Sequence, residues 1–136
     1  MMQDTQPNTL VRVAKWIDEN KKGVIVTKPA MFVAIAVVEQ LIQRLGEEGI
    51  WTSLLDRLIR AFLDQDKESS LKQSILITAA LHPVGHLLAR EIVAKVNCVG
   101  KDVKKEVLSV LAGEVDRLSG DKFGSFVLKG LADSVM

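Results

Sequence analysis

Apolar residues recur along most of this chain with the spacing of amphipathic helices. In residues 9–20, for example, Leu10, Val13 and Trp16 form a stripe. Apolar positions three to four residues apart are typical of a helix that buries one face. The pattern predicts six or seven helices with short joints, over about 9–20, 29–45, 50–64, 71–81, 86–97, 103–118 and 121–135.

The segment 30–38 is apolar on every side and follows Pro29, with Thr27 or Lys28 at the N-cap position. Proline fits the first turn of a helix, because its missing N–H has no partner there. A helix that is apolar all round is usually buried, so we expect 29–45 to be the central, most buried helix, with a subunit interface as the alternative. The β-branched residues 24–27 are expected to form a linker.

The two tryptophans, Trp16 and Trp51, fall on apolar faces of their predicted helices. Tryptophan is common both in interiors and at the centres of interfaces. We therefore expect each of them either in the core or as an anchor for a partner.

Helices without a convincing strand predict an all-α fold. The 136 residues are one ordinary domain in size, so we expect 1–136 to be a single all-α domain, complete or a fragment of a longer helical-repeat protein. This pattern fits two architectures: a stack of helix pairs or an irregular helical bundle.

Two segments, 82–96 and 121–135, superpose without a gap, with Gly85 on Gly124. Self-similarity with a period of about 40 residues indicates a helical repeat. The units here would be about 82–118 and 121–136. Glycine has no Cβ and so lets a helix begin close to its neighbour. The alternative is that two unrelated helices each begin after a glycine.

The run "VKKEVLSVLAGEVDRLSGDKFGSFVLKGL" resembles Pumilio-type (PUF) repeats, and "LHPVGHLLAREIVAKV" is similar to the irregular repeats of their Puf-A/Penguin branch. The resemblance covers residues 81–135. It implies a short right-handed stack of PUF/HEAT-like α-α repeats. It also implies a non-catalytic module that contacts the RNA backbone without strict sequence specificity. The resemblance further implies a role in ribosome assembly and a nuclear or nucleolar location.

In that family the residues one, two and five positions after the glycine contact RNA. Carried over, the resemblance implies His86, Leu87 and Arg90 in one unit and Ser125, Phe126 and Lys129 in the other, with Lys122 on the same face. Cations replace the family's base-reading glutamine or glutamate, and cations favour phosphate contacts that carry no sequence information. Leu87 cannot stack on a base, whereas Phe126 can. The candidate RNA-binding residues are His86, Arg90, Lys122, Ser125, Phe126 and Lys129.

The charge balance favours a second hypothesis. Lys and Arg number 18 and Asp and Glu 17, so the chain has no overall field that attracts nucleic acid. With few aromatic residues and strongly apolar helices, it also fits an all-α protein–protein interaction or adaptor subunit. Under either hypothesis we expect the chain to be part of a larger assembly, with RNA or a protein as its partner.

Other chemistry is not expected. Cys98 is the sole cysteine, which excludes an intrachain disulfide and fits a reducing intracellular compartment. If the family resemblance does not hold, we expect that compartment to be the cytoplasm. His82 and His86 are four residues apart but have no third ligand near, so no metal or cofactor is expected. No catalytic motif is present, so we expect neither an enzyme nor a small-molecule substrate. The longest apolar run, 30–38, is too short to span a membrane.

Overall fold

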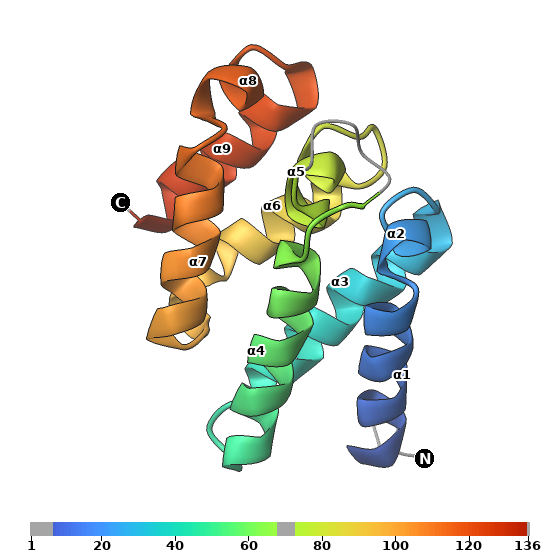
Figure 1. The fold of residues 1–136 in the computed structure, drawn as a ribbon. Helices are drawn as coiled ribbons and strands as arrows, with labels where there is room; N and C mark the ends of the chain where they lie inside the picture. Colours follow the sequence, from blue (N-terminus) through green and yellow to red (C-terminus); the bar gives the residue numbers. More distant parts are fainter. Residues whose placement is uncertain (1–6, 68–72, 136) are drawn as a thin grey trace.

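The computed structural model describes residues 7–67 and 73–135, and over these residues the predicted all-α class is confirmed (Figure 1). The described residues form nine α-helices and one 3-10 turn, with no strand beyond a single bridge between Gln65 and Ser74. None of the described helices is long and apolar enough to cross a membrane. The elements are α1 (Pro7–Glu19), α2 (Lys21–Val24), α3 (Lys28–Gln43), α4 (Gly49–Leu63), α5 (Ile75–Ala80), α6 (His86–Ala94), the 3-10 turn (Val96–Cys98), α7 (Lys101–Ala112), α8 (Val115–Ser119) and α9 (Lys122–Val135).

The helices are packed as a bundle in two rows. Figure 1 shows α1, α4 and α7 side by side in one row and α3, α6 and α9 in the other, and neighbours within each row pack on one another. The short helices α2, α5 and α8 join the rows at one end. The core lies between the rows. Its largest fully buried side chains are Phe62, Ile17, Ile25, Met31, Leu41, Leu55, Ile59, Leu76, Ile77, Leu88, Leu111 and Leu118.

The order long, short, long occurs three times along the chain, in α1–α3, α4–α6 and α7–α9, and the sequence pattern did not indicate the short helices α2 and α8. The expected helix 103–118 is divided at Gly113 into α7 and α8, and α2 ends at Val24, the first residue of the expected linker. Such short helices contain too few periods for the apolar pattern to identify them. The helix expected at 71–81 is shorter, because α5 begins after Ser74, whose Oγ accepts from the Ile77 N–H at 3.3 Å. Residues 71 and 72 lie outside the described residues.

Helix α1 buries a different stripe from the one expected. Leu10, Ala14 and Ile17 are buried, whereas Trp16 is 47% exposed. Successive helical residues are about 100° apart, so the spacing i, i+3, i+6 drifts around the helix while i, i+4, i+7 stays on one side. The two tryptophans therefore have different environments, since Trp51 is only 4% exposed and stacks against Arg44, whose Cζ is 5.1 Å from the ring centre.

Helix α3 is not buried on every side. Met31, Ala34 and Val38 face the core, but Phe32 and Val33 are 48% and 45% exposed. This exposure follows from the position of α3 as the first helix of its row. Within the row α3 has α6 on one side and no described helix on the other. The apolar run thus supplies both core and surface, and the expectation of a fully buried central helix was wrong.

A chain of polar contacts connects the three short helices. Lys22 on α2 pairs with Asp66 at 2.8 Å, and Asp66 accepts a hydrogen bond from Thr78 on α5 at 3.0 Å. Gln73 donates to the Thr78 hydroxyl at 2.9 Å and accepts from Arg117 on α8. Asp66 is 5% exposed, so the partners that keep this buried carboxylate bonded are required for stability.

The substitution Thr78→Val should lower the free energy of unfolding by about 1–3 kcal/mol, because it leaves Asp66 and Gln73 without their shared hydroxyl partner while keeping the side-chain shape. Urea unfolding monitored by circular dichroism measures this. The matched control is Thr52→Val in α4, at a half-buried threonine outside the polar chain. Equal effects of the two substitutions would contradict a special role for Thr78.

Candidate functional site

Helices α6 and α9 begin with the same local geometry. Nδ1 of His82 accepts from the backbone N–H groups of Val84 and Gly85 at 3.0 and 3.4 Å. Oδ1 of Asp121 accepts from Phe123 and Gly124 at 2.8 and 2.9 Å. The first N–H groups of a helix have no partner within the helix, so Asp121 acts as a cap of α9, whereas His82 holds the turn that directly precedes α6. The aligned segments therefore share hydrogen bonding as well as apolar spacing.

The two aligned glycines lie in closely similar surroundings. A Cβ built on Gly85 would be 2.6 Å from the carbonyl oxygen of Ile25 and 3.0 Å from Cα of Ala79, the buried residue near the end of α5. A Cβ on Gly124 would be 2.7 Å from the carbonyl oxygen of Leu118 and 2.8 Å from its Cα. In both places the short helix approaches too closely for any side chain. This is the close approach that the sequence predicted for these glycines.

Helix α3 follows the same plan as α6, with Met31 in the place of His86. The backbone N–H of Met31 donates to the Thr27 carbonyl at 2.8 Å, as that of His86 does to the His82 carbonyl at 3.1 Å. The longer α4–α5 joint changes the offset between the two helices, which is why the sequence comparison did not find this third instance. The buried positions also correspond, because Ala34, Val37, Val38 and Leu41 match Ala89, Ile92, Val93 and Val96.

Five of the six predicted RNA-binding residues, all except Lys122, therefore occupy three equivalent positions on neighbouring helices of one row. We refer to this surface as the α3–α6–α9 face. The first position holds Met31, His86 and Ser125, the second holds Phe32, Leu87 and Phe126, and the third holds Ile35, Arg90 and Lys129. Met31 is fully buried, so on α3 only the second and third positions reach the surface.

Arg90 lies across α9. Its guanidinium carbon is 4.5 Å from the centre of the Phe126 ring, a distance typical of a cation–π contact. A Cβ on Gly130 would be 2.8 Å from Cγ of Arg90, so glycine at this position makes room for the arginine stem. Arg90 is thus held against Phe126, which is itself 37% exposed.

Three rings meet beside this contact. The ring of His86 is 4.7 Å from that of Phe123 and 5.6 Å from that of Phe126, measured between centres. Nζ of Lys122 lies 5.8 Å from the centre of the Phe123 ring. The structure therefore brings together four of the six predicted site residues. We call His86, Arg90, Lys122, Phe123 and Phe126 the aromatic–cationic cluster.

The other two predicted residues, Ser125 and Lys129, are not in the cluster. The Ser125 hydroxyl donates to the Lys122 carbonyl at 3.1 Å and so bonds within its own helix. Lys129 is exposed on α9 at the position equivalent to Arg90. No described helix follows α9 in the row for Lys129 to cross. Its ammonium group extends the positive charge of the face.

A shallow groove of about 200 Å³ separates α3 from α6 on the same face. Phe32, Ile35, Leu87 and Ala94 give it apolar walls, and Arg90 and Glu91 also line it. Burial raises the pKa of Glu91 above its ordinary value, against the pull of Lys95, and the nearby Glu39 raises it further. The volume is below the range of about 300–1,000 Å³ that is common for small-molecule sites.

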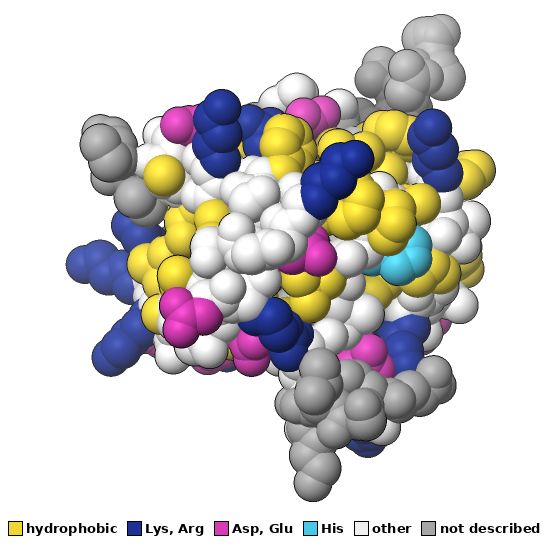
Figure 2. All heavy atoms as spheres, turned by 90° about the horizontal axis from the view of Figure 1, so that it is seen from above, with side chains coloured by type: hydrophobic (Ala, Val, Ile, Leu, Met, Phe, Trp, Pro, Cys, Tyr) yellow, Lys and Arg dark blue, Asp and Glu magenta, His cyan; other side chains and the backbone are white. Residues whose placement is uncertain are grey.

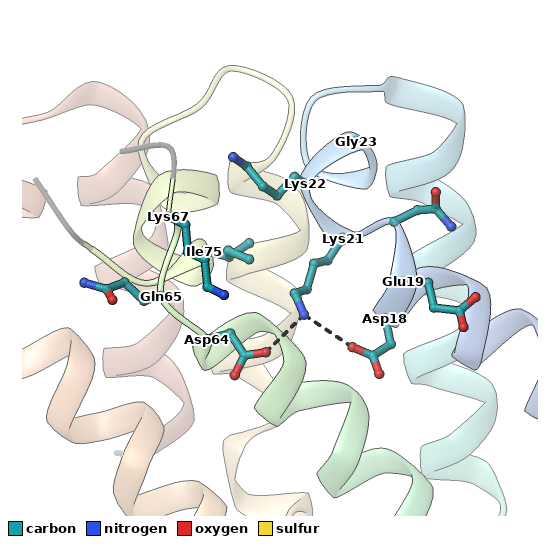
Figure 3. A pocket seen from close by; sticks show the side chains of 10 residues that line it. Asp18, Glu19, Lys21, Lys22, Gly23, Asp64, Gln65, Lys67 and Ile75 are labelled. Carbon is teal, nitrogen blue, oxygen red and sulfur yellow. Dashed lines mark hydrogen bonds and ion pairs between the residues drawn. The ribbon is translucent and has the colours of Figure 1, made fainter. Parts of the chain in front are cut away.

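A wider hollow of about 960 Å³ lies elsewhere, between the α1–α2 corner and the α4–α5 joint (Figure 3). Lys21 points into it and is held by Asp64 at 3.0 Å and Asp18 at 3.4 Å. Burial acts to lower the pKa of Lys21, but the two carboxylates outweigh it and raise the pKa above its usual value. The charges in this hollow thus neutralise one another, and within the described residues no group of His, Cys, Asp and Glu is arranged to hold a metal.

Charges of both signs are interspersed on the surface seen in Figure 2, with apolar side chains and a histidine between them. Lys and Arg are not collected into one stripe in this view. Any nucleic-acid contact on this side would therefore be local. No protein-family model matches the chain, and no curated protein or solved structure matches it. The resemblance to Pumilio-type repeats stays a prediction.

Phe32, Phe123 and Gly130 belong to this face but were not among the predicted residues. Phe123 directly precedes the aligned Gly124, and Gly130 directly follows Lys129, so both were visible in the sequence as neighbours of predicted positions. Phe32 had no such signal, since α3 lacks a glycine at the matching position, where Ala30 stands.

Gly85→Ala and Gly124→Ala should each lower the free energy of unfolding by about 1–3 kcal/mol, because the new methyl would overlap the backbone of the neighbouring segment. Thermal or urea unfolding of the purified variants measures this. Gly23→Ala in α2 is the control, since nothing lies within 4 Å of its Cβ position. A destabilisation by Gly23→Ala as large as that of the other two would show that loss of glycine alone, and not overlap, is responsible.

Glu91→Gln should stabilise the protein at neutral pH. Because the folded-state pKa of Glu91 is raised, the folded state favours the protonated carboxyl, and stability is lost as pH rises through that pKa. Glutamine removes this loss, so the gain should shrink as pH falls below 4.5, the ordinary pKa of the group. Melting temperatures across this pH range test it, with Glu19→Gln at an exposed site on α1 as the control. A pH-independent gain would contradict the assignment.

Proposed function

We propose that the α3–α6–α9 face binds single-stranded RNA through its backbone and through stacking, without strict readout of sequence. The aromatic–cationic cluster is the observation that carries the proposal. It combines an exposed ring, that of Phe126, with the cations Arg90 and Lys122. Exposed rings beside cations are the common elements of sequence-tolerant single-strand binding.

The arrangement of the equivalent positions supports this function. Phe32 and Phe126 occupy the same position on α3 and α9, so two aromatic side chains lie along one row with Leu87 between them on α6. Successive bases can stack on such a row, each contact contributing about 1–3 kcal/mol. Lys122 and Lys129 lie at the α9 end of the row, where phosphates would be neutralised. On this proposal the chain is a short helical-repeat module with no catalytic role.

The cation at the third position favours tolerance over specificity. Arg90 packs on Phe126 and over Gly130, so its guanidinium is engaged with the protein. A long cation in this place adds positive charge but offers no acceptor to a base edge, and phosphate contacts carry no sequence information. A role in ribosome assembly accords with the family resemblance and is part of the proposal.

A protein partner is the second candidate, and the α3–α6 groove favours it. Phe32 is 48% exposed and lies beside Ile35 and Leu87 in a groove with apolar walls. An amphipathic helix or strand of an adaptor partner could use such a surface. Stacked helices serve both uses, and therefore the fold does not discriminate between them.

Anisotropy titrations with labelled single-stranded RNAs of unrelated sequence test the first candidate. We expect binding that weakens with salt, and Lys122→Ala with Lys129→Ala should lower the slope of log K against log salt by about 0.7 for each phosphate that is no longer neutralised. Phe126→Leu should weaken binding by about fivefold or more, because leucine has no ring on which a base can stack. Lys105→Ala, an exposed lysine of α7 in the other row, is the matched control.

Two results would contradict the RNA proposal, which are absence of binding at low salt and a decrease in affinity in Lys105→Ala equal to that in the variants of the face. Either result would make a protein partner the favoured candidate. Arg90→Ala is a poor test, because it also removes packing against Phe126 and Gly130.

A further inference from the structure

The two histidines of the chain, His82 and His86, use their Nδ1 atoms in opposite ways. Nδ1 of His82 accepts from the backbone N–H groups of Val84 and Gly85 at 3.0 and 3.4 Å. An imidazole nitrogen accepts only while it carries no proton, so His82 is neutral in this turn, with its proton on Nε2. Nδ1 of His86 lies 3.0 Å from the carbonyl oxygen of His82. Because a carbonyl oxygen can only accept, this nitrogen carries a proton and donates.

Uptake of a second proton therefore affects the two side chains differently. In His86 the proton is added at Nε2, and the hydrogen bond from Nδ1 to the carbonyl oxygen stays in place. In His82 it is added at Nδ1, where it removes the lone pair and places an N–H group against two other N–H groups. The charged form of His82 is thus incompatible with the turn 82–85 that precedes α6, whereas the charged form of His86 is compatible with it.

The N–H groups of Val84 and Gly85 depend on this one acceptor. Within the described part of the chain, neither group makes a hydrogen bond to any other atom. Gly85 is buried and lies against the backbone of Ile25 and Ala79. A backbone N–H that loses its acceptor away from water destabilises the structure that contains it. Protonation of His82 therefore disfavours the turn at the point where three segments of the chain meet.

The equivalent turn before α9 does not share this sensitivity. Asp121 stands at the position of His82, and its Oδ1 accepts from the N–H groups of Phe123 and Gly124 at 2.8 and 2.9 Å. Nδ1 of histidine and Oδ1 of aspartate are both bonded to Cγ, so the two side chains place an acceptor at the same point. A carboxylate keeps its lone pairs over the range of about pH 5 to 8, in which histidine changes its charge. The two turns thus have one geometry but respond differently to acid.

The surroundings of His82 provide no carboxylate that would favour its charged form. Helix α5, which packs on α6, contains no titratable residue. The titratable groups on α2, in the first turns of α3, α6 and α9, and directly before α9 are Lys21, Lys22, Lys28, His86, Lys122 and Asp121. Of these, Asp121 is the sole acid, and its Oδ1 is bonded to the start of its own helix. No ion pair of the described residues includes His82.

We propose that the turn 82–85 is a pH-sensitive element of the fold, in which protonation of His82 releases two backbone N–H groups and loosens the start of α6. Because the folded state requires neutral His82, stability that is present at higher pH is lost as the pH falls through the range in which histidine takes up a proton. His86 and Arg90 follow this turn, so acid also loosens the α6 side of the aromatic–cationic cluster, while α9 keeps its start. This property does not depend on what binds the α3–α6–α9 face.

Melting temperatures of the full chain between about pH 8 and about pH 5.5 test the proposal. His82→Asn is the informative variant, because its amide oxygen accepts at every pH. Over this range the unaltered chain should lose about 3–8 °C of Tm relative to His82→Asn. His86→Gln is the matched control and should keep the pH dependence of the unaltered chain. Glu91 acts with the opposite sign, but it is common to all of these proteins and cancels in the comparison.

Circular dichroism at the upper pH verifies that each variant is folded. If His82→Asn is unfolded, His82→Asp takes its place, because it copies the side chain that holds the turn before α9. Equal pH dependence in the unaltered chain and in the folded variant would overturn the proposal. A pH dependence that His86→Gln abolishes would overturn it as well.

Nitrogen NMR of the imidazole rings gives a second measurement on the unaltered protein. At the upper pH the proton should lie on Nε2 in His82 and on Nδ1 in His86. On acidification the amide groups of Val84 and Gly85 should lose protection from hydrogen exchange, while those of the turn before α9 keep theirs. A proton on Nδ1 of His82 at the upper pH would contradict the assigned role of this side chain.

Discussion

The close approach of the short helices α5 and α8 to the chain that leads into α6 and α9 is the constraint on which the rest of this fold depends. At Gly85 and Gly124 the gap admits no Cβ, because backbone atoms of Ala79 on α5 and Leu118 on α8 occupy the space, and at Gly85 the carbonyl oxygen of Ile25 adds to them. His82 accepts from the N–H groups of the turn that leads into α6, and Asp121 accepts from the first N–H groups of α9. Because both helices begin in the same way, the residues that follow each glycine reach equivalent places on one surface.

That shared start has a functional consequence. Side chains that are far apart along the chain lie on neighbouring helices, so His86 and Arg90 reach the ring of Phe126. A third glycine, Gly130, makes room for the arginine stem on α9. The proposed RNA surface is thus a product of helix spacing, and no single segment of the chain contains it.

Much of the architecture could be predicted from the sequence. The all-α class, the positions of most long helices and the matching of Gly85 with Gly124 all follow from local spacing. The short helices α2 and α8 could not be found in this way, because they have four and five residues and show no periodicity. The correspondence of α3 with α6 was hidden by the longer α4–α5 joint and by Ala30 in place of the glycine.

For the candidate site, the sequence alone identifies which residues of α6 and α9 stand at equivalent helical positions, since the offset from glycine is a property of the chain. Tertiary structure decided which of them meet. Arg90 and His86 reach the phenylalanines because α6 packs on α9, whereas Lys122 adjoins Phe123 within α9 itself. Lys129 stays apart because no described helix follows α9. It also decided that Trp51 is core and Trp16 surface, although both lie on helices of similar pattern. The physical reason is that spacing along a helix selects a face, but only the neighbouring helix determines whether that face is covered.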